Sequence, residues 1–394
     1  MAKKDVAILD FGSEKISVII ASEDVNNTFA IKGVGECEYA GFMDGNFLEP
    51  ENLKLAMGLA INNAELNSKM EIREEIKELY IGVPTEFTFC VCNTASQTYP
   101  RLKMVTQNDI DELFVMGNDF GNYKTHKVIN QAAIYYVLDD NGKVTNPLGL
   151  ATNKITACMS YILADNNFIR LIDKFLVDLS ITKATYISSA LAEAKYLFDE
   201  EKRDGYALLV DCGYITTTVA LVRGDGILSL SSFSMGGGHI TADLMQCLKI
   251  SFAQAESLKR KVVLSISPDT NDVYEVVTDD GILPISAKMA GEIVECRIEE
   301  IAKHILKCLN NCEYEYPHYI PISLTGGGLC YLKGAKDTLA KYLGMNVEIV
   351  SPPIPQLNKP HNSSKIGLLD IALKQEKLKK PKGLLAKLKA LIKR

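Results

Sequence analysis

The hydrophobic pattern at the start of the chain predicts two strands joined by a tight turn, then a helix and another strand. Residues 5–21 contain VAILDFG and EKISVIIA, two short apolar runs separated by turn residues, which is typical of buried strands. Residues 51–66 carry apolar side chains at the spacing of one helical face, and residues 77–83 form another apolar run. This succession indicates an α/β fold.

The pattern becomes β-rich from Pro84 to about Asn166, with one helix predicted from Asp109 to about Phe120. A helix is then predicted over NNFIRLIDKFLVDL, and KATYISSALAEAKYLF begins as a strand and continues as a helix. The change of pattern marks a separate region of the fold.

The segment YALLVDCGYITTTVALVRGDGILSLSSF repeats the pattern of the N-terminal strands. In each copy an apolar strand ends in Asp-x-Gly, first at Asp10 and Gly12 and again at Asp211 and Gly213. A turn with hydroxyl residues and a returning strand follow in both. This internal repeat predicts two similar lobes with a cleft between them.

Both turns carry residue types that bind phosphate. Glycine allows a tight turn whose N–H groups can surround a phosphate, and Ser13, Thr216 and Thr217 add hydroxyls. Asp10 and Asp211 are candidates for holding magnesium through water, because that ion keeps several waters and takes few carboxylates. One such turn alone is more often an ordinary β-turn, so the prediction depends on the duplication.

Two glycine runs and one helical pair extend the candidate site. The first run precedes a helix whose cap is predicted near Thr241 or Asp243, and the second lies between an apolar strand and a helix. A helix-initiating loop without a ligand is the alternative for the second run. Neither run fits a Rossmann or Walker A motif. The runs are Gly236, Gly237 and Gly238, and Gly326, Gly327 and Gly328.

Glu256 and Lys259 lie three residues apart, and so share one face of a predicted helix. From there both could reach a ribose or a base. The alternative is a salt bridge on the helix surface.

The C-terminal segment combines apolar and basic residues. Of 43 basic and 49 acidic residues in the chain, nine basic and one acidic fall from Lys374 onward. Residues 381–394, PKGLLAKLKALIKR, predict an amphipathic helix that binds an anionic bilayer. A helix packed on the protein's own body is the alternative. The apolar face consists of Leu384, Leu385, Leu388, Leu391 and Ile392, with Lys387, Lys389 and Lys393 elsewhere on the helix.

Other features narrow the class of protein. No apolar run is long enough for a transmembrane helix, and the N-terminus lacks the pattern of a signal peptide. The ten cysteines form no CxxC pair, which favours reduced thiols in a cytoplasmic protein.

The order of these motifs resembles the actin, chaperone and sugar-kinase ATPase superfamily, and within it most closely the FtsA family of bacterial cell-division proteins. The similarity is carried by GGGHITADL at 236–244, AESLK at 255–259, EIVECRIEEI at 292–301 and the Asn146-Pro147-x-Gly149 turn. It covers about residues 5–351 and then the tail.

The resemblance implies an actin-like two-lobed fold with duplicated phosphate-binding hairpins and an inserted subdomain, 1C. Subdomain 1A is expected over 1–83 and 167–204, 1C over 84–166, 2A over 205–245, a 2B region over 246–312, and the end of 2A with a return to 1A over 313–373. A short basic linker over 374–381 and a membrane-targeting helix over 382–394 follow.

The resemblance also implies ligands, partners and a location. ATP with magnesium is expected at Asp10, Gly12, Ser13, Lys15, Asp211, Gly213, Thr216, Thr217, Glu256, Lys259 and the two glycine runs. The C-terminal peptide of FtsZ is expected near Arg297, for which an intrahelical pair with Glu300 is the alternative. Further expected partners are other copies in a filament and anionic lipids, but no nucleic acid, at the cytoplasmic face of the cell membrane at the division site.

Four residues at the phosphate turns depart from the FtsA pattern. FtsA proteins usually have a small or hydroxyl residue at Glu14, glycines at Tyr214 and Ile215, and an acid at Thr218. Glu14 adds negative charge near phosphates, and Ile215 adds a branched side chain where the backbone should approach one closely. ATP binding with slow or absent hydrolysis is therefore predicted.

Two other classes remain open: a superfamily enzyme such as a sugar kinase or exopolyphosphatase, and an actin homologue of pilus assembly of the PilM type. Both usually lack the C-terminal amphipathic helix, so residues 381–394 discriminate between them and the leading hypothesis. That hypothesis is a polymerising membrane anchor for FtsZ filaments.

Overall fold

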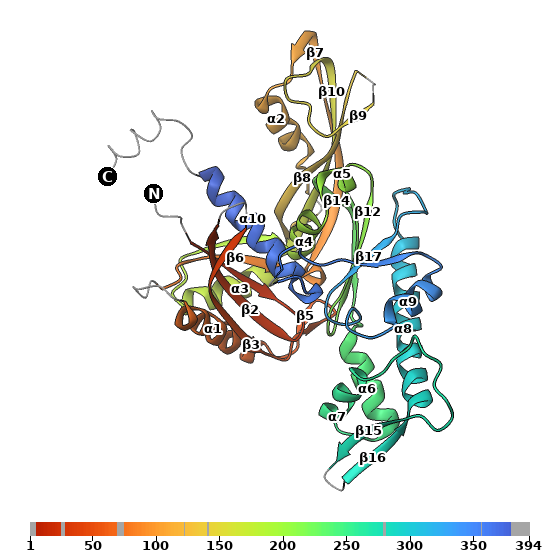
Figure 1. Cartoon of the computed structure of the whole chain (residues 1–394). Helices are drawn as coiled ribbons and strands as arrows, with labels where there is room; N and C mark the ends of the chain where they lie inside the picture. The colour runs from red at the N-terminus through yellow and green to blue at the C-terminus, as the bar shows by residue number, and fades with distance from the viewer. Residues whose placement is uncertain are drawn as a thin grey trace.

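The computed structural model describes residues 5–24, 28–68, 75–121, 123–139, 142–278, 281–355 and 357–379. Two five-stranded sheets with the same topology organise these residues (Figure 1). The first has the order β11-β6-β1-β2-β3 and the second β14-β13-β12-β17-β18. In each sheet an antiparallel hairpin, β1–β2 or β12–β13, continues into a parallel strand, β6 or β17. The internal repeat predicted from the sequence is therefore a repeat of sheet topology.

The first sheet and its helices form the first lobe. Its strands are β1 (Val6–Phe11), β2 (Lys15–Glu23), β3 (Phe29–Glu38), β6 (Glu78–Val83) and β11 (Lys183–Ser188). The helices are α1 (Pro50–Asn67), α3 (Asn166–Asp178), α4 (Ser189–Leu197) and α10 (Ser363–Lys379), with the short strands β4 (Phe42–Met43) and β5 (Asn46–Phe47) and the 3₁₀ turns η2 (Thr85–Phe87) and η3 (Pro360–Asn362).

Strand β1 is buried along its whole length because helices cover both faces of the first sheet. Alternate side chains of a strand point to opposite faces. Leu9 packs in a core that includes residues of α1 and α3, whereas Ile8 packs in one that includes residues of α4 and α10. This two-sided burial explains the continuous apolar run in the sequence. Helix α10 thereby brings the end of the described chain back to the first lobe (Figure 1).

The second sheet and its helices form the second lobe. Its strands are β12 (Ala207–Cys212), β13 (Thr217–Arg223), β14 (Gly226–Phe233), β17 (Ile322–Thr325) and β18 (Val347–Ile349). The helices are α5 (Glu200–Asp204), α6 (Gly237–Leu248), α7 (Phe252–Lys259), α8 (Ala287–Asn310) and α9 (Ala335–Leu343), and the hairpin β15 (Val273–Thr278) and β16 (Gly281–Ser286) lies at the far end (Figure 1).

A separate four-stranded sheet occupies the region where the sequence pattern becomes β-rich. Its order is β7-β10-β8-β9, and it projects from the lobes with α2 packed against it (Figure 1). We call it the inserted sheet. Its elements are β7 (Thr88–Met104), α2 (Gln107–Gly117), β8 (His126–Leu138), β9 (Lys143–Val144) and β10 (Ala151–Asp165).

Two predicted boundaries differ from the structure. Helix α2 begins at Gln107, two residues before the predicted start, because the Asp109 carboxylate accepts the backbone N–H of Thr106 at 2.8 Å and makes Thr106 the N-cap. The predicted linker overlaps α10, which runs to Lys379. In this part of α10 the Glu376 carboxylate accepts the Tyr80 hydroxyl at 2.7 Å, and Lys377 pairs with Glu23 at 2.5 Å.

The predicted membrane-binding residues, Leu384 to Lys393, lie outside the described residues. Within the described residues, no helix is long and apolar enough to span a bilayer. All ten cysteines are free thiols.

Candidate functional site

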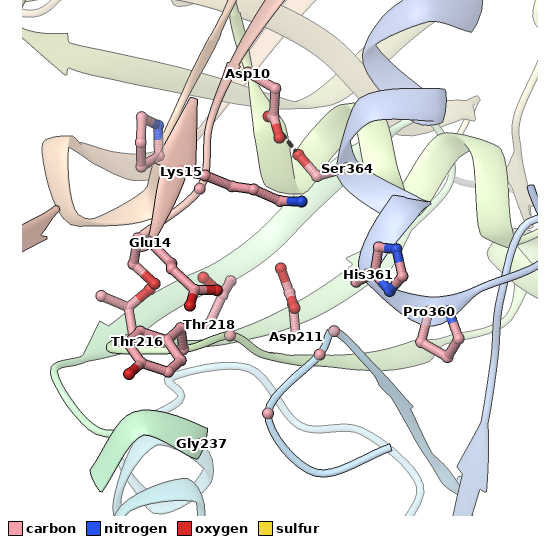
Figure 2. Close-up of a pocket in the computed structure, with 18 of the residues that line it drawn as sticks. Asp10, Glu14, Lys15, Asp211, Thr216, Thr218, Gly237, Pro360, His361 and Ser364 are labelled. Carbon is pink, nitrogen blue, oxygen red and sulfur yellow. Dashed lines mark hydrogen bonds between the residues drawn. The ribbon is translucent and has the colours of Figure 1, made fainter. Parts of the chain in front are cut away.

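A cavity of about 680 Å³ lies between the two lobes, at the turns of the duplicated hairpins. Figure 2 shows Glu14 and Lys15 from the first hairpin and Asp211 and Thr216 from the second around it. Most of the residues predicted to bind nucleotide line this cavity: Asp10, Gly12, Ser13, Lys15, Asp211, Gly213, Thr216, Gly237, Glu256, Lys259, Gly326, Gly327 and Gly328. Thr217, Gly236 and Gly238 do not; the Thr217 hydroxyl is buried and donates to the carbonyl oxygen of Met235 at 2.6 Å.

The two hairpins close with the same hydrogen bond. The N–H of Gly12 donates to the carbonyl oxygen of Lys15 at 3.0 Å, and the N–H of Gly213 donates to that of Thr216 at 2.8 Å. A Cβ at Gly12 would lie 2.9 Å from the Lys15 oxygen, so the turn excludes larger residues. Equivalent turns from two lobes thus face one cavity, as the repeat predicts.

The glycine runs permit close backbone packing beside the second hairpin. Gly326 has φ +88°, and a Cβ there would lie 2.2 Å from the Asp211 carboxylate. The N–H of Gly328 donates to the carbonyl oxygen of Cys212 at 2.7 Å. A Cβ at Gly237 would lie 2.7 Å from the Cα of Gly328, so the two runs pack directly against each other.

The start of α6 differs from the prediction. Its N-cap is Gly236, not Thr241 or Asp243, because Gly236 lies against the second hairpin, where a Cβ would meet the Gly213 oxygen at 2.4 Å. Thr241 instead donates its hydroxyl to the Glu256 carboxylate at 2.6 Å. Asp243 accepts two hydrogen bonds from Arg297, at 2.6 and 2.8 Å.

Lys259 is held at the cavity wall by several oxygens. Its ammonium pairs with Glu256 at 2.6 Å and donates to the carbonyl oxygen of Gly237 at 3.0 Å and to Thr241 at 2.8 Å. Glu256 and Lys259 therefore form the salt bridge that the sequence suggested, and both also line the cavity. The ring of Tyr214 packs on Gly238, where a Cβ would lie 2.9 Å from it.

Three carboxylates gather at the base of the cavity: Asp10, Asp211 and Glu193. Burial, followed by the charge of Asp10, raises the pKa of Asp211 to about 7. Burial, followed by the charges of Asp211 and Asp10, raises the pKa of Glu193 well above its ordinary value. Burial also raises the pKa of Asp10, although the Ser364 hydroxyl donates to it at 2.7 Å (Figure 2).

A chain of ion pairs links the first hairpin to α10. The Glu36 carboxylate binds Lys15 at 2.6 Å and Lys365 at 2.9 Å. Burial acts to raise the pKa of Glu36, but hydrogen bonds from both lysines outweigh it and lower this pKa to about 2. The sequence patterns identified neither Glu193 nor Ser364 nor Lys365. For Glu193 the available signal was an acid in an apolar helical segment.

The residues that depart from the FtsA pattern also lie at the cavity. Glu14 is an exposed residue that lines the cavity and points inward (Figure 2). Burial, then the charges of Glu38 and Glu256, raises the pKa of Glu14. Thr218 lines the cavity, and the backbone N–H of Ile215 is bonded to Ser13.

Comparison with known proteins supports a relationship to one family. The family profile described as "Cell division protein FtsA" matches residues 208–367. The chain is 23% identical to the FtsA protein of Neisseria meningitidis over 94% of this chain and 91% of that protein. It is 21% identical to FtsA of Escherichia coli K12 over 93% of this chain and 90% of that protein. The similarity predicted from the motifs is confirmed.

Solved structures with the same architecture confirm the actin-like two-lobed fold. A structure of the PilM–PilN type IV pilus biogenesis complex matches with a TM-score of 0.62 and 14% identity, covering 94% of this chain and 99% of that one. MreB5 of Spiroplasma citri bound to AMPPNP matches with a TM-score of 0.55 and 12% identity, covering 96% and 98%.

Proposed function

We propose that this chain, a relative of the FtsA cell-division proteins, binds ATP with magnesium in the interlobe cavity and tethers FtsZ filaments to the cytoplasmic membrane. The observation that carries the nucleotide half is the pair of equivalent hairpin turns, from Gly12 to Lys15 and from Gly213 to Thr216, that face one cavity. Short turns of this kind present backbone N–H groups to phosphates.

The remaining lining residues suit the other parts of a nucleotide. The backbone of Gly326, Gly327 and Gly328 has no side chains to block a flat base, and Glu256 and Lys259 offer polar atoms to a ribose. We assign the phosphates to the hairpin turns, where Lys15 supplies positive charge.

The carboxylates at the base of the cavity fit a bound cation. Asp10 and Asp211 repel each other's negative charge, and both have raised pKa values. Magnesium, held by these two residues through water, would relieve this repulsion and neutralise phosphate charge. Burial beside these two charges raises the pKa of Glu193 well above its ordinary value, so this carboxyl favours its protonated form.

The hydrolysis expected at this cavity is slow or absent. Glu14 places negative charge beside the proposed phosphates, which opposes further negative charge in the transition state. The N–H of Ile215 already donates to Ser13 at 2.9 Å, so a phosphate must displace this bond to use it.

Membrane attachment, self-assembly and FtsZ binding rest on the family relationship and on the sequence of residues 381–394. For FtsZ, the proposed docking region is the second lobe near Arg297 on α8. The guanidinium of this arginine donates two hydrogen bonds to the Asp243 carboxylate, so its first role is to join α8 to α6. The intrahelical pair with Glu300 is not its main contact.

A substitution that fills the cavity tests the nucleotide site. A Cβ at Gly327 would have no neighbour closer than 3.5 Å, so Gly327→Val adds bulk without a backbone clash. Gly291→Val on α8 is the matched control, because a Cβ there would have nothing within 4 Å. By calorimetry with magnesium, ATP affinity should fall about tenfold or more in Gly327→Val and stay unchanged in Gly291→Val. No binding of adenine nucleotide by the unaltered protein at millimolar concentration would reject the proposal.

A further inference from the structure

A second cavity, of about 330 Å³, lies where the inserted sheet meets the second lobe. It shares no lining residue with the interlobe cavity. Strands β8 and β9 supply one side, and α5 and β13 supply the other. The lining residues are Ile134, Tyr135, Lys143, Val144, Thr145, Asn146, Asp204 and Arg223.

Two cations in this cavity converge on one tyrosine ring. The Lys143 ammonium lies 4.3 Å from the ring centroid of Tyr135, and the Arg223 guanidinium carbon lies 5.1 Å from the same centroid. Among the described residues, neither Lys143 nor Arg223 has an acidic partner within 4.0 Å. Asp204, the one acid in the lining, forms no ion pair with either. The two cations repel each other, and with Asp204 as the one acid in the lining they leave the cavity with a net positive charge.

The Arg223 side chain is held in place by Tyr206. Its guanidinium stacks on the Tyr206 ring at 4.6 Å and donates from Nη1 to the Tyr206 hydroxyl at 2.8 Å. The next residue, Gly224, is so close to β8 that a Cβ would lie 2.2 Å from the Ile134 oxygen. The guanidinium therefore has a fixed position, and its remaining N–H groups form a fork suited to two oxygens of one anion.

We propose that this cavity binds a small phosphate-class oxyanion that bridges Lys143 of the inserted sheet and Arg223 of the second lobe. A phosphate carries about −1.5 to −2 charges at neutral pH, which matches two cations better than a single carboxylate does. The volume is at the low end of small-molecule pockets, about 300 to 1,000 Å³, which suits free phosphate or a small phosphate ester. Thr145 and Asn146, which also line the cavity, supply further polar groups.

The test uses the full chain saturated with magnesium and ADP, so that the interlobe cavity does not compete for the probe. Titrations with inorganic phosphate and with glycerol phosphate, in a phosphate-free buffer, distinguish the free ion from the ester. Lys143→Gln and Arg223→Gln should each weaken binding about tenfold or more. Lys124→Gln removes the same charge from the inserted-sheet region but does not line the cavity, and should bind like the unaltered protein.

The melting temperature of each variant shows whether it is correctly folded. Lys143 is the more decisive position, because its side chain is exposed and its substitution disturbs the fold less. Arg223→Lys keeps the charge but loses the fork, and should bind with intermediate affinity. The proposal would be overturned if neither inorganic phosphate nor glycerol phosphate bound at about 10 mM, which is on the order of the dissociation constants of the weakest specific sites. Equal binding by Lys143→Gln and the unaltered protein would overturn it as well.

Discussion

The hydroxyl oxygen of Ser13 accepts the backbone N–H of Ile215 at 2.9 Å, so that the turn of one lobe is hydrogen-bonded to the turn of the other. The Ile215 side chain also reaches the first lobe, where a Cβ at Gly41 would lie 3.0 Å from its Cδ1. The two hairpins therefore touch where the proposed function places the phosphates.

Removal of the hydrogen bond between Ser13 and Ile215 should weaken the contact between the two lobes. Ser13→Ala leaves the Ile215 N–H without its partner, so the free energy of unfolding should fall by about 1 kcal/mol. Urea denaturation measures the change. Ser96→Ala is the control, because it removes a hydroxyl pair with Thr156 at 2.8 Å on an exposed face of the inserted sheet and should have a smaller effect. Equal losses in both variants would contradict a special role for the interlobe bond.

Neutralisation of Glu14 should favour the more highly charged nucleotide. Glu14→Gln removes a carboxylate that points into the cavity, so affinity should rise more for ATP than for ADP, by about two- to tenfold. Calorimetry at low salt measures both affinities. Glu38→Gln removes a neighbouring charge that does not line the cavity, and it should change the ratio of ATP affinity to ADP affinity less. An unchanged ratio in Glu14→Gln would show that this carboxylate does not face the phosphates.

The raised pKa of Asp211, about 7 against an ordinary 3.8, should make stability depend on pH in a defined direction. The folded state favours the protonated carboxyl of Asp211. The contribution of this group to the free energy of unfolding is therefore fully present below about pH 4 and is lost as the pH rises through about 7. Asp211→Asn should therefore melt at a higher temperature than the unaltered protein at pH 8 but not at pH 4.

Magnesium competes with that proton. Its stabilising effect on the unaltered protein should grow from pH 6 to pH 8 and be much reduced in Asp211→Asn. Asp178→Asn serves as control: Lys54 lowers the pKa of Asp178, so this acid is ionised throughout that range. A magnesium effect that is independent of pH would contradict the assignment of the cation to Asp211.

A charge swap separates the two roles of Arg297. Arg297→Glu alone would place two acids together and destabilise the contact between α8 and α6. Combining it with Asp243→Arg restores an ion pair in the opposite sense. If the FtsZ peptide contacts Arg297, the double variant should recover the melting temperature but not peptide binding, as measured by fluorescence anisotropy. Recovery of both would leave Arg297 with a structural role only.

The tail prediction is tested with vesicles. Leu388→Glu places a charge in the proposed apolar face, and a chain ending at Lys380 removes that face entirely; both should lose co-sedimentation with anionic liposomes. Leu388→Ile keeps the apolar character and should bind like the unaltered protein. Binding should fall with salt because the basic residues contribute through screened charge. Equal sedimentation of all four proteins would mean that the tail is not the anchor.

Features encoded within a few neighbouring residues could be predicted from the sequence, and features that depend on distant residues could not. Asp10 with Gly12, and Asp211 with Gly213, form local turns, so their repeat was visible in the sequence. The N-cap of α6 was misplaced because contact with the Gly213 oxygen, not local capping preference, determines where that helix begins.

The same limit applies to the charged groups of the cavity. Glu193 approaches from α4 and Lys365 from α10, and nothing near them in the sequence marks them as partners of Asp10 or Glu36. For Arg297 the sequence suggested FtsZ docking, or a pair with Glu300 on its own helix, whereas its partner Asp243 lies 54 positions earlier. Such pairs become apparent only when the sheets bring the segments together.

Helix α10 begins at the cavity and ends where the described chain ends. Its second residue, Ser364, donates to Asp10, and the whole helix is 17 residues long, about 25 Å at the rise of an α-helix. Near its other end the same helix is tied to the first lobe, by the bond between Glu376 and Tyr80 and by the ion pair of Lys377 with Glu23, so it moves with that lobe as one rigid body. A ligand that moves the first lobe relative to the second would therefore carry the end of α10 at Lys379 with it, and α10 is in mechanical terms a strut rather than a hinge.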